Sequence, residues 1–317
     1  MAHGMFTQCL AVLFKEAPPL EAVEAALASF DINGLHAATA HWALGGPSVS
    51  LKYRPEVNGL VFADVVDQRW PDHMGDPQKD ANLFSAWTMG HFGPSADADS
   101  LLRATQQCWG WRDGKAIALT HRGFVRVRPT YVLGAADNVP PVPADWNAVV
   151  ELTYLTKVVE ALLQVSGALC YFNPNGEVLR DIKGVQSHLK QAAGDDLLLI
   201  DLWCNVRIYP FHADWTMMDT VGNGQLNDAT SVTSEVRDIE AVFRTKHYVA
   251  GEVDGFLRDM TLYLHTEGDV IKDGDTLDGP GNVPWRATLA DQSVAMPPRR
   301  VLHVVPMDGV APPVQPA

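Results

Sequence analysis

The sequence predicts an α+β fold made of two similar halves. Short apolar stretches of strand length alternate with amphipathic stretches of helix length along the 317 residues. A segment rich in small residues and proline, 135–145, separates an N-terminal half, 1–134, from a C-terminal half, 146–306. A flexible proline-rich tail, 307–317, follows. We expect each half to contain a mixed or antiparallel sheet with helices, in a variant of the ferredoxin-like βαββαβ unit.

The N-terminal half begins with a buried strand and an amphipathic helix. Pro18 and Pro19 precede the predicted helix, where a missing backbone N–H costs nothing. Acidic residues at 97 and 99 favour the positive end of a later helix. The predicted strands are 9–14, 49–53, 60–66 and 83–92, the predicted helices are 20–30 and 97–109, and 116–132 is predicted to be extended.

The C-terminal half is organised around the stretch 167–210. Its Asn-Pro-Asn-Gly sequence at 173–176 predicts a tight turn, because Asn and Gly tolerate a left-handed backbone. The predicted strands are 168–172, 197–209, 216–221 and 238–244, and the predicted helices are 146–165, 181–192 and 253–266.

Matches between the halves suggest an internal duplication. At a constant offset of 155 residues, Lys52 aligns with Arg207 and Asp64 aligns with Asp219. We therefore hypothesise two diverged copies packed about a pseudo-twofold axis.

The charge balance excludes some classes of partner. The formal net charge is −14, from 38 acidic and 24 basic residues, which argues against binding to a nucleic-acid backbone. It suits a protein that attracts a basic protein partner. The sequence contains no stretch long and apolar enough for a membrane span, no signal peptide and no CxxC pair, so we expect a cytoplasmic protein.

Motifs for common chemistries are absent from the sequence. It contains no HExxH, GxSxG or phosphate-cradling glycine motif, and we expect no enzyme activity, no metal and no cofactor. An alternative remains a hydrolase whose site combines His212, Asp214 and Asp219, because a histidine and two carboxylates can perform acid–base catalysis.

Two segments are candidates for partner binding. Trp70 lies in a polar loop, where we expect it to be exposed and able to anchor a partner. Acidic residues could attract a basic surface. The candidate binding residues are Trp70, Asp72, Asp76, Asp269, Asp273, Asp275 and Asp278.

Several motifs carry a resemblance to a known family. They include Ala11-Val-Leu-Phe, His121-Arg-Gly-Phe-Val-Arg-Val-Arg, Tyr171-Phe-Asn-Pro-Asn-Gly-Glu and Asp273-Gly-Asp-Thr. Through them the chain resembles bacterial proteins with a domain of unknown function, DUF4261, often encoded near type VI secretion genes. The resemblance implies a role in interbacterial competition and supplies no catalytic residues.

The expected function is therefore that of an immunity protein. Such a protein would bind a secreted toxin and neutralise it by occlusion, with acidic residues speeding the encounter and aromatic anchors holding the complex. The alternatives are an adaptor or accessory protein of the secretion system, and the hydrolase described above.

Overall fold

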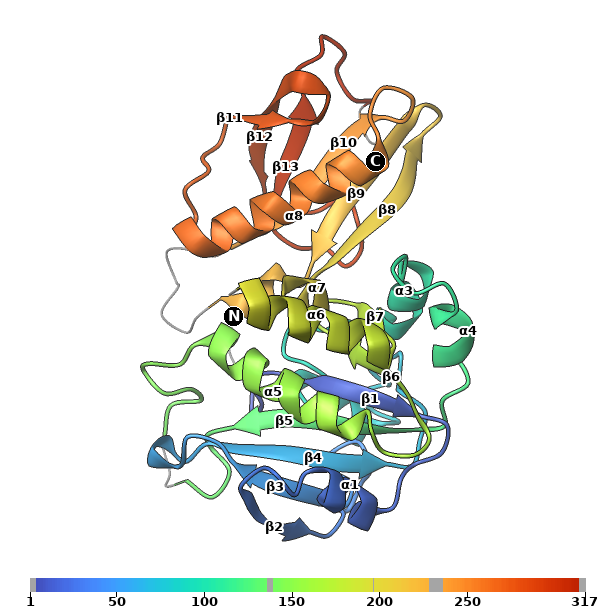
Figure 1. Ribbon diagram of the computed structural model, residues 1–317, viewed down its shortest axis with the longest axis vertical. Coiled ribbons are helices and arrows are strands. Elements are labelled where there is room, and N and C mark those ends of the chain that lie inside the picture. Colours follow the sequence, from blue (N-terminus) through green and yellow to red (C-terminus); the bar gives the residue numbers. More distant parts are fainter. Residues whose placement is uncertain (1–3, 136–138, 196, 228–235, 314–317) are drawn as a thin grey trace. The chain divides into compact units, whose positions relative to one another are not determined.

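The computed structural model describes residues 4–135, 139–195, 197–227 and 236–313 (Figure 1). These residues form two compact units, one ending at Trp203 and the other beginning at Cys204. Each unit is α+β, as the sequence predicted. Residues 136–138 of the expected linker and 314–317 of the expected tail lie outside the described residues.

Unit 1 is built on a seven-stranded antiparallel sheet. Its order is β2-β3-β4-β5-β1-β6-β7, with β1 and β5 at the centre. Every residue of β1 and β5 is buried, and β1 consists of apolar residues alone. The strands are β1 (Leu10–Phe14), β2 (Ile32–His36), β3 (Ser48–Lys52), β4 (Leu60–Val66), β5 (Gly123–Thr130), β6 (Ala168–Asn173) and β7 (Val178–Arg180).

Helices cover the sheet of unit 1. Helix α5 (Ala148–Leu162) packs against β1 and β5 and begins at Asn147, whose side chain accepts a hydrogen bond from the Val150 N–H. The other helices are α1 (Leu20–Ala26), α2 (Ala81–Thr88), α3 (Ser100–Gln106), α4 (Gly114–Ala118), α6 (Ile182–Asp195) and α7 (Ile200–Trp203).

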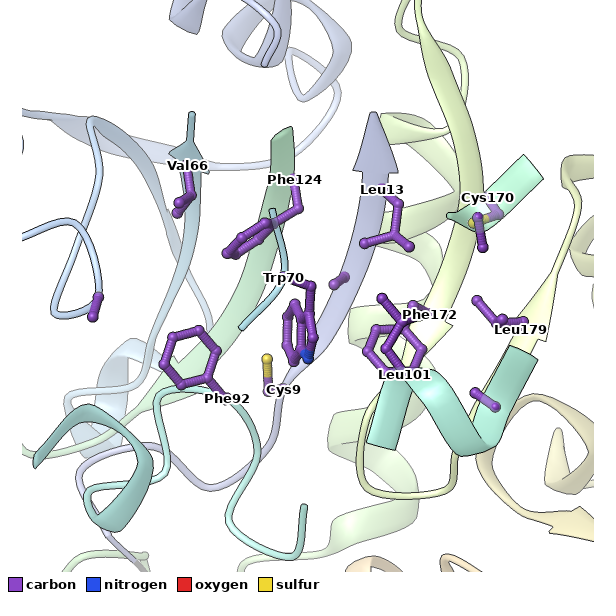
Figure 2. Packing of buried hydrophobic residues seen from close by; sticks show 14 of the residues in the cluster. Cys9, Leu13, Val66, Trp70, Phe92, Leu101, Phe124, Cys170, Phe172 and Leu179 are labelled. Carbon is purple, nitrogen blue, oxygen red and sulfur yellow. The ribbon is translucent and has the colours of Figure 1, made fainter. Parts of the chain in front are cut away.

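Helices α2, α3 and α4 contribute to an aromatic core on unit 1. Trp70 lies at the centre of this core, and its ring meets Phe92, Phe124 and Phe172 edge-on at centroid distances of 5.0–5.3 Å (Figure 2). Such T-shaped pairs are favourable because the ring edge is positive and the face negative. Trp70 therefore packs the loop after β4 against the sheet.

Unit 2 has a six-stranded mixed sheet of order β11-β12-β13-β10-β9-β8. Strands β10 and β13 are parallel and all other neighbours are antiparallel. Helix α8 (Ala250–Glu267) packs on this sheet through Val253, Leu257, Met260 and Leu264. The strands are β8 (Asn205–His212), β9 (Trp215–Val221), β10 (Asp238–Arg244), β11 (Thr276–Gly279), β12 (Val283–Ala290) and β13 (Val301–Pro306).

Some predicted elements differ from the structure. The predicted strand 83–92 is helix α2, because Leu83, Ala86 and Trp87 have helical spacing and together face the core. The predicted strand 197–209 is divided between helix α7 and strand β8. The predicted extended segment 116–132 starts within helix α4. Apolar runs of this length do not distinguish a buried helix from a strand.

The structure does not confirm the duplication. The two sheets have different strand orders, and the offset of 155 aligns strand β10 with helix α2. The sequence also placed the division at 135–145, whereas the compact units divide after Trp203. Strand β6 belongs to unit 1 because it hydrogen-bonds to β1, and β7 follows it in the same sheet.

Candidate functional site

Helix α8 of unit 2 presents an acidic face to solvent. Glu252, Asp259, Tyr263 and Glu267 are exposed and separated by seven, four and four residues. At 3.6 residues per turn this spacing places the four side chains on one side of the helix, beside the buried stripe that contains Val253. The Tyr263 side chain is 50% exposed in the middle of this row. An aromatic ring among carboxylates is a surface suited to a basic protein partner.

The loop after α8 continues the acidic character. Asp273, Asp275 and Asp278 are exposed, and Asp269 is half-buried. Two of these carboxylates also shape the loop, since Asp273 accepts a hydrogen bond from the Leu289 N–H and Asp275 accepts one from the Lys272 N–H. Within the described residues, no group of three His, Cys, Asp or Glu side chains is arranged to hold a metal ion.

The other three candidate binding residues lie in unit 1. Trp70 is only 4% exposed, so the expectation that it is exposed is wrong. The residues next to Trp70 in the sequence are polar, but its side chain packs in the aromatic core described above. Asp72 accepts hydrogen bonds from the Leu101 and Leu102 N–H groups and thus caps helix α3. Asp76 is exposed, and its side chain accepts hydrogen bonds from the Gln78 and Lys79 N–H groups.

Unit 2 also contains a buried network of charged side chains. Arg207 and Arg299 both bind the Asp219 carboxylate, and Arg299 Nε donates to Asp238 Oδ2 at 2.8 Å. Burial raises the pKa of Asp238, and the Arg299 guanidinium opposes that change. Arg299 also donates to the carbonyl oxygens of Pro297 and Thr220, so each of its three nitrogens has an acceptor. We call Arg207, Asp219, Asp238 and Arg299 the unit 2 network.

The alternative catalytic trio is not brought together for acid–base work. His212 and Asp214 are exposed at the hairpin between β8 and β9. Asp219 is fully buried and forms ion pairs with Arg207 and Arg299. Because both arginines already bind the Asp219 carboxylate inside the unit, it is not available to act with His212 or Asp214.

Unit 1 holds a second buried network, which the sequence reasoning missed. Asp64 on β4 receives hydrogen bonds from Arg126 and Arg128 on β5, with Nη2-to-oxygen distances of 2.8 Å for both. Burial favours protonation of Asp64, but the two adjacent guanidinium groups outweigh burial and hold its pKa below the ordinary value. Arg128 Nη1 also donates to His91 Nδ1 at 2.6 Å. We call Asp64, His91, Arg126 and Arg128 the unit 1 network.

The sequence does contain a signal for this network. Arg126 and Arg128 are two residues apart in the apolar strand β5, so they share one face of a fully buried strand. Asp64 is likewise the lone charge within the strand Leu60–Val66. Charged residues in otherwise apolar strands are rarely buried without a partner, and this pattern predicts pairing.

One comparison with known proteins gives a result. Residues 219–305 match the model of a family described as "Domain of unknown function (DUF4261)". The matched segment covers just over a quarter of the chain and contains helix α8, its acidic face and most of the unit 2 network. No curated protein and no solved structure matches the chain. In the described residues, no helix is long and apolar enough to cross a membrane.

Proposed function

We propose that this protein binds a basic protein partner through the acidic face of helix α8. The alignment of Glu252, Asp259, Tyr263 and Glu267 on one exposed side of the helix is the observation that carries the proposal. The carboxylates accelerate the encounter through long-range attraction. Tyr263 supplies the apolar area that a lasting complex needs.

The nature of the partner rests on the sequence resemblance. A toxin used in interbacterial competition fits it, and the protein would then act in the cytoplasm as an immunity protein that occludes the toxin. A toxin that cleaves nucleic acid has a basic substrate-binding surface, which complements the acidic face. The net charge of −14 supports the same complementarity.

The test is a pull-down with the tagged full chain, followed by a toxicity assay. Native extract is passed over the protein at low and at near-physiological salt, and a stoichiometric partner is expressed alone and together with this protein. The proposal expects the partner to be toxic alone and harmless in the presence of the protein. A partner that is harmless alone favours the secretion adaptor instead. Absence of a partner at both salt concentrations rejects the binding function.

Matched variants locate the interface. Tyr263→Ala is expected to weaken the complex by about 2 kcal/mol, as for an aromatic anchor. Asp259→Lys is expected to slow association about tenfold at low salt. Asp67→Lys makes the same change of charge at an exposed position of unit 1 and serves as the control. Equal effects of Asp259→Lys and Asp67→Lys would reject the α8 face as the interface.

A further inference from the structure

Unit 1 contains a cavity that borders the unit 1 network. Its volume is about 390 Å³, within the range of small-molecule binding sites. Its walls come from the N-terminal segment, the ends of β2 and β3, strands β4 and β5, and the loop after α2. Much of the lining is apolar, including Phe6, Leu44, Phe62, Met89 and Leu133. The cavity therefore favours a ligand with an apolar body.

The loop that closes one side of the cavity depends on Gly46. A Cβ atom at this position would collide with the Val65 carbonyl, so the backbone can approach β4 only with glycine. At this close approach the Gly46 N–H donates to Asp64 Oδ2. The cavity wall and the unit 1 network are thus joined by a backbone contact.

The charges beside the cavity do not balance. Arg126 and Arg128 carry two positive charges, and Asp64, which lies between them, carries one negative charge. His91 is neutral, because burial and the two nearby arginines lower its pKa to about 2. Asp64 is the one acidic side chain in the cavity lining. The unit 1 network thus holds one surplus positive charge.

Two buried donors of the network have no acceptor. Arg128 Nε and His91 Nε2 lack a hydrogen-bond partner among the residues that the structure describes, and both residues line the cavity. Since Arg128 donates to His91 Nδ1, the proton of the neutral ring is on Nε2. The Leu44 carbonyl near the ring favours protonation but completes no hydrogen bond with Nε2. His91 is 4% exposed and Arg128 is 3% exposed, so a donor left unpaired on either side chain costs free energy.

We propose that the cavity binds a small monocarboxylate with an apolar body. The carboxylate accepts hydrogen bonds from Arg128 Nε and His91 Nε2, and its charge neutralises the surplus positive charge of the unit 1 network. The apolar body contacts Phe6, Phe62 and the other apolar walls. This site is separate from the acidic face of helix α8 and lies in the other unit.

Octanoate is a suitable probe. The control ligands are 1-octanol and octylamine, which have the same chain length but a neutral and a cationic head group. Calorimetric titration of the full chain is expected to show one site for octanoate, at least tenfold weaker binding of 1-octanol, and none for octylamine. Equal binding of all three would overturn the proposal, because it would mean an apolar cavity without selection for charge. Tighter binding of inorganic phosphate, or no octanoate binding below about 1 mM, would overturn it as well.

Variants test whether octanoate binding depends on the Arg128 donor and on the open cavity. Arg128→Met is expected to weaken octanoate binding at least tenfold and to leave 1-octanol binding unchanged. Arg122→Met removes an exposed arginine from the same segment and is the matched control. Ala37→Trp fills an exposed position of the cavity wall without touching the unit 1 network, and it is expected to abolish binding of both probes. Octanoate binding at wild-type strength to Ala37→Trp or Arg128→Met would overturn the proposal.

Discussion

The two units each bury a carboxylate between two arginines, but the two networks differ in balance. In the unit 2 network, Asp219 and Asp238 offset Arg207 and Arg299, and every nitrogen of Arg299 has an acceptor. In the unit 1 network, Asp64 alone offsets Arg126 and Arg128, and two donors remain unpaired beside a cavity.

This difference separates a structural role from a binding role. Burying a charge is costly unless it is paired and hydrogen-bonded, so a balanced and satisfied network holds its own strands together. An unbalanced network with unpaired donors is completed by a ligand that brings the missing charge and acceptors. Similar residues therefore stabilise unit 2 and prepare unit 1 for binding.

The largest predicted effect comes from removing the central charge of the unit 2 network. Asp219→Asn leaves Arg207 buried without its carboxylate and is expected to lower the free energy of unfolding of unit 2 by about 3–5 kcal/mol. Amide hydrogen exchange in β8 and β9 measures the loss. Asp214→Asn, at an exposed position of the same hairpin, is the control and should stay within about 0.5 kcal/mol. Similar losses for both variants would show that Asp219 is not held as described.

A second prediction concerns a buried acid that has no arginine ligand. Glu151 is hydrogen-bonded by the hydroxyl groups of Thr7 and Tyr131, and burial raises its pKa from 4.5 to about 7. Because the folded-state pKa is the higher one, the contribution of Glu151 to the stability of unit 1 is fully present below pH 4.5, and about 3 kcal/mol of it is lost as the pH rises to about 7.

The variant Glu151→Gln tests this pH dependence. It has no ionisable group at the site, so unit 1 of this variant should lose less stability than wild type between pH 4.5 and pH 7. Denaturant unfolding of the two proteins across this pH range measures the difference. Parallel pH profiles would mean that Glu151 is already ionised in the folded state.

The smallest predicted effect is that of an arginine–aspartate pair at the surface. Asp254 and Arg258 are one helical turn apart on α8, joined at 2.9 Å, and both are partly exposed. Asp254→Asn is expected to cost about 0.5 kcal/mol or less, because solvent screens the pair. Thermal unfolding of unit 2 measures it. A loss as large as that of Asp219→Asn would contradict the distinction between buried and exposed pairs.

Local sequence patterns predicted much of the fold. Strands β1, β3 and β4 and helices α5 and α8 were expected within a few residues of their bounds, because each is a continuous apolar or periodic segment. Helix α2 was missed, since an apolar run of ten residues fits either structure. The pairing of β6 with β1 was also missed, because it joins residues about 160 positions apart and leaves no local signal.

The candidate sites were predictable to different degrees. The acidic face of α8 and its loop are visible in the sequence because the charges are neighbours along the chain. Trp70 was misjudged because burial depends on distant rings such as Phe172. The cavity of unit 1 is lined by residues from Met5 to Leu133, so its unpaired donors become apparent only in the folded structure.

One measurement tests the difference between the networks most directly, namely hydrogen exchange in Arg299→Met and Arg128→Met. We predict that Arg299→Met destabilises unit 2 by about 3 kcal/mol, because Asp238 loses its cation. In contrast, Arg128→Met is expected to change the stability of unit 1 by about 1 kcal/mol or less, because Asp64 keeps Arg126. Equal losses in the two units would contradict a surplus arginine in unit 1.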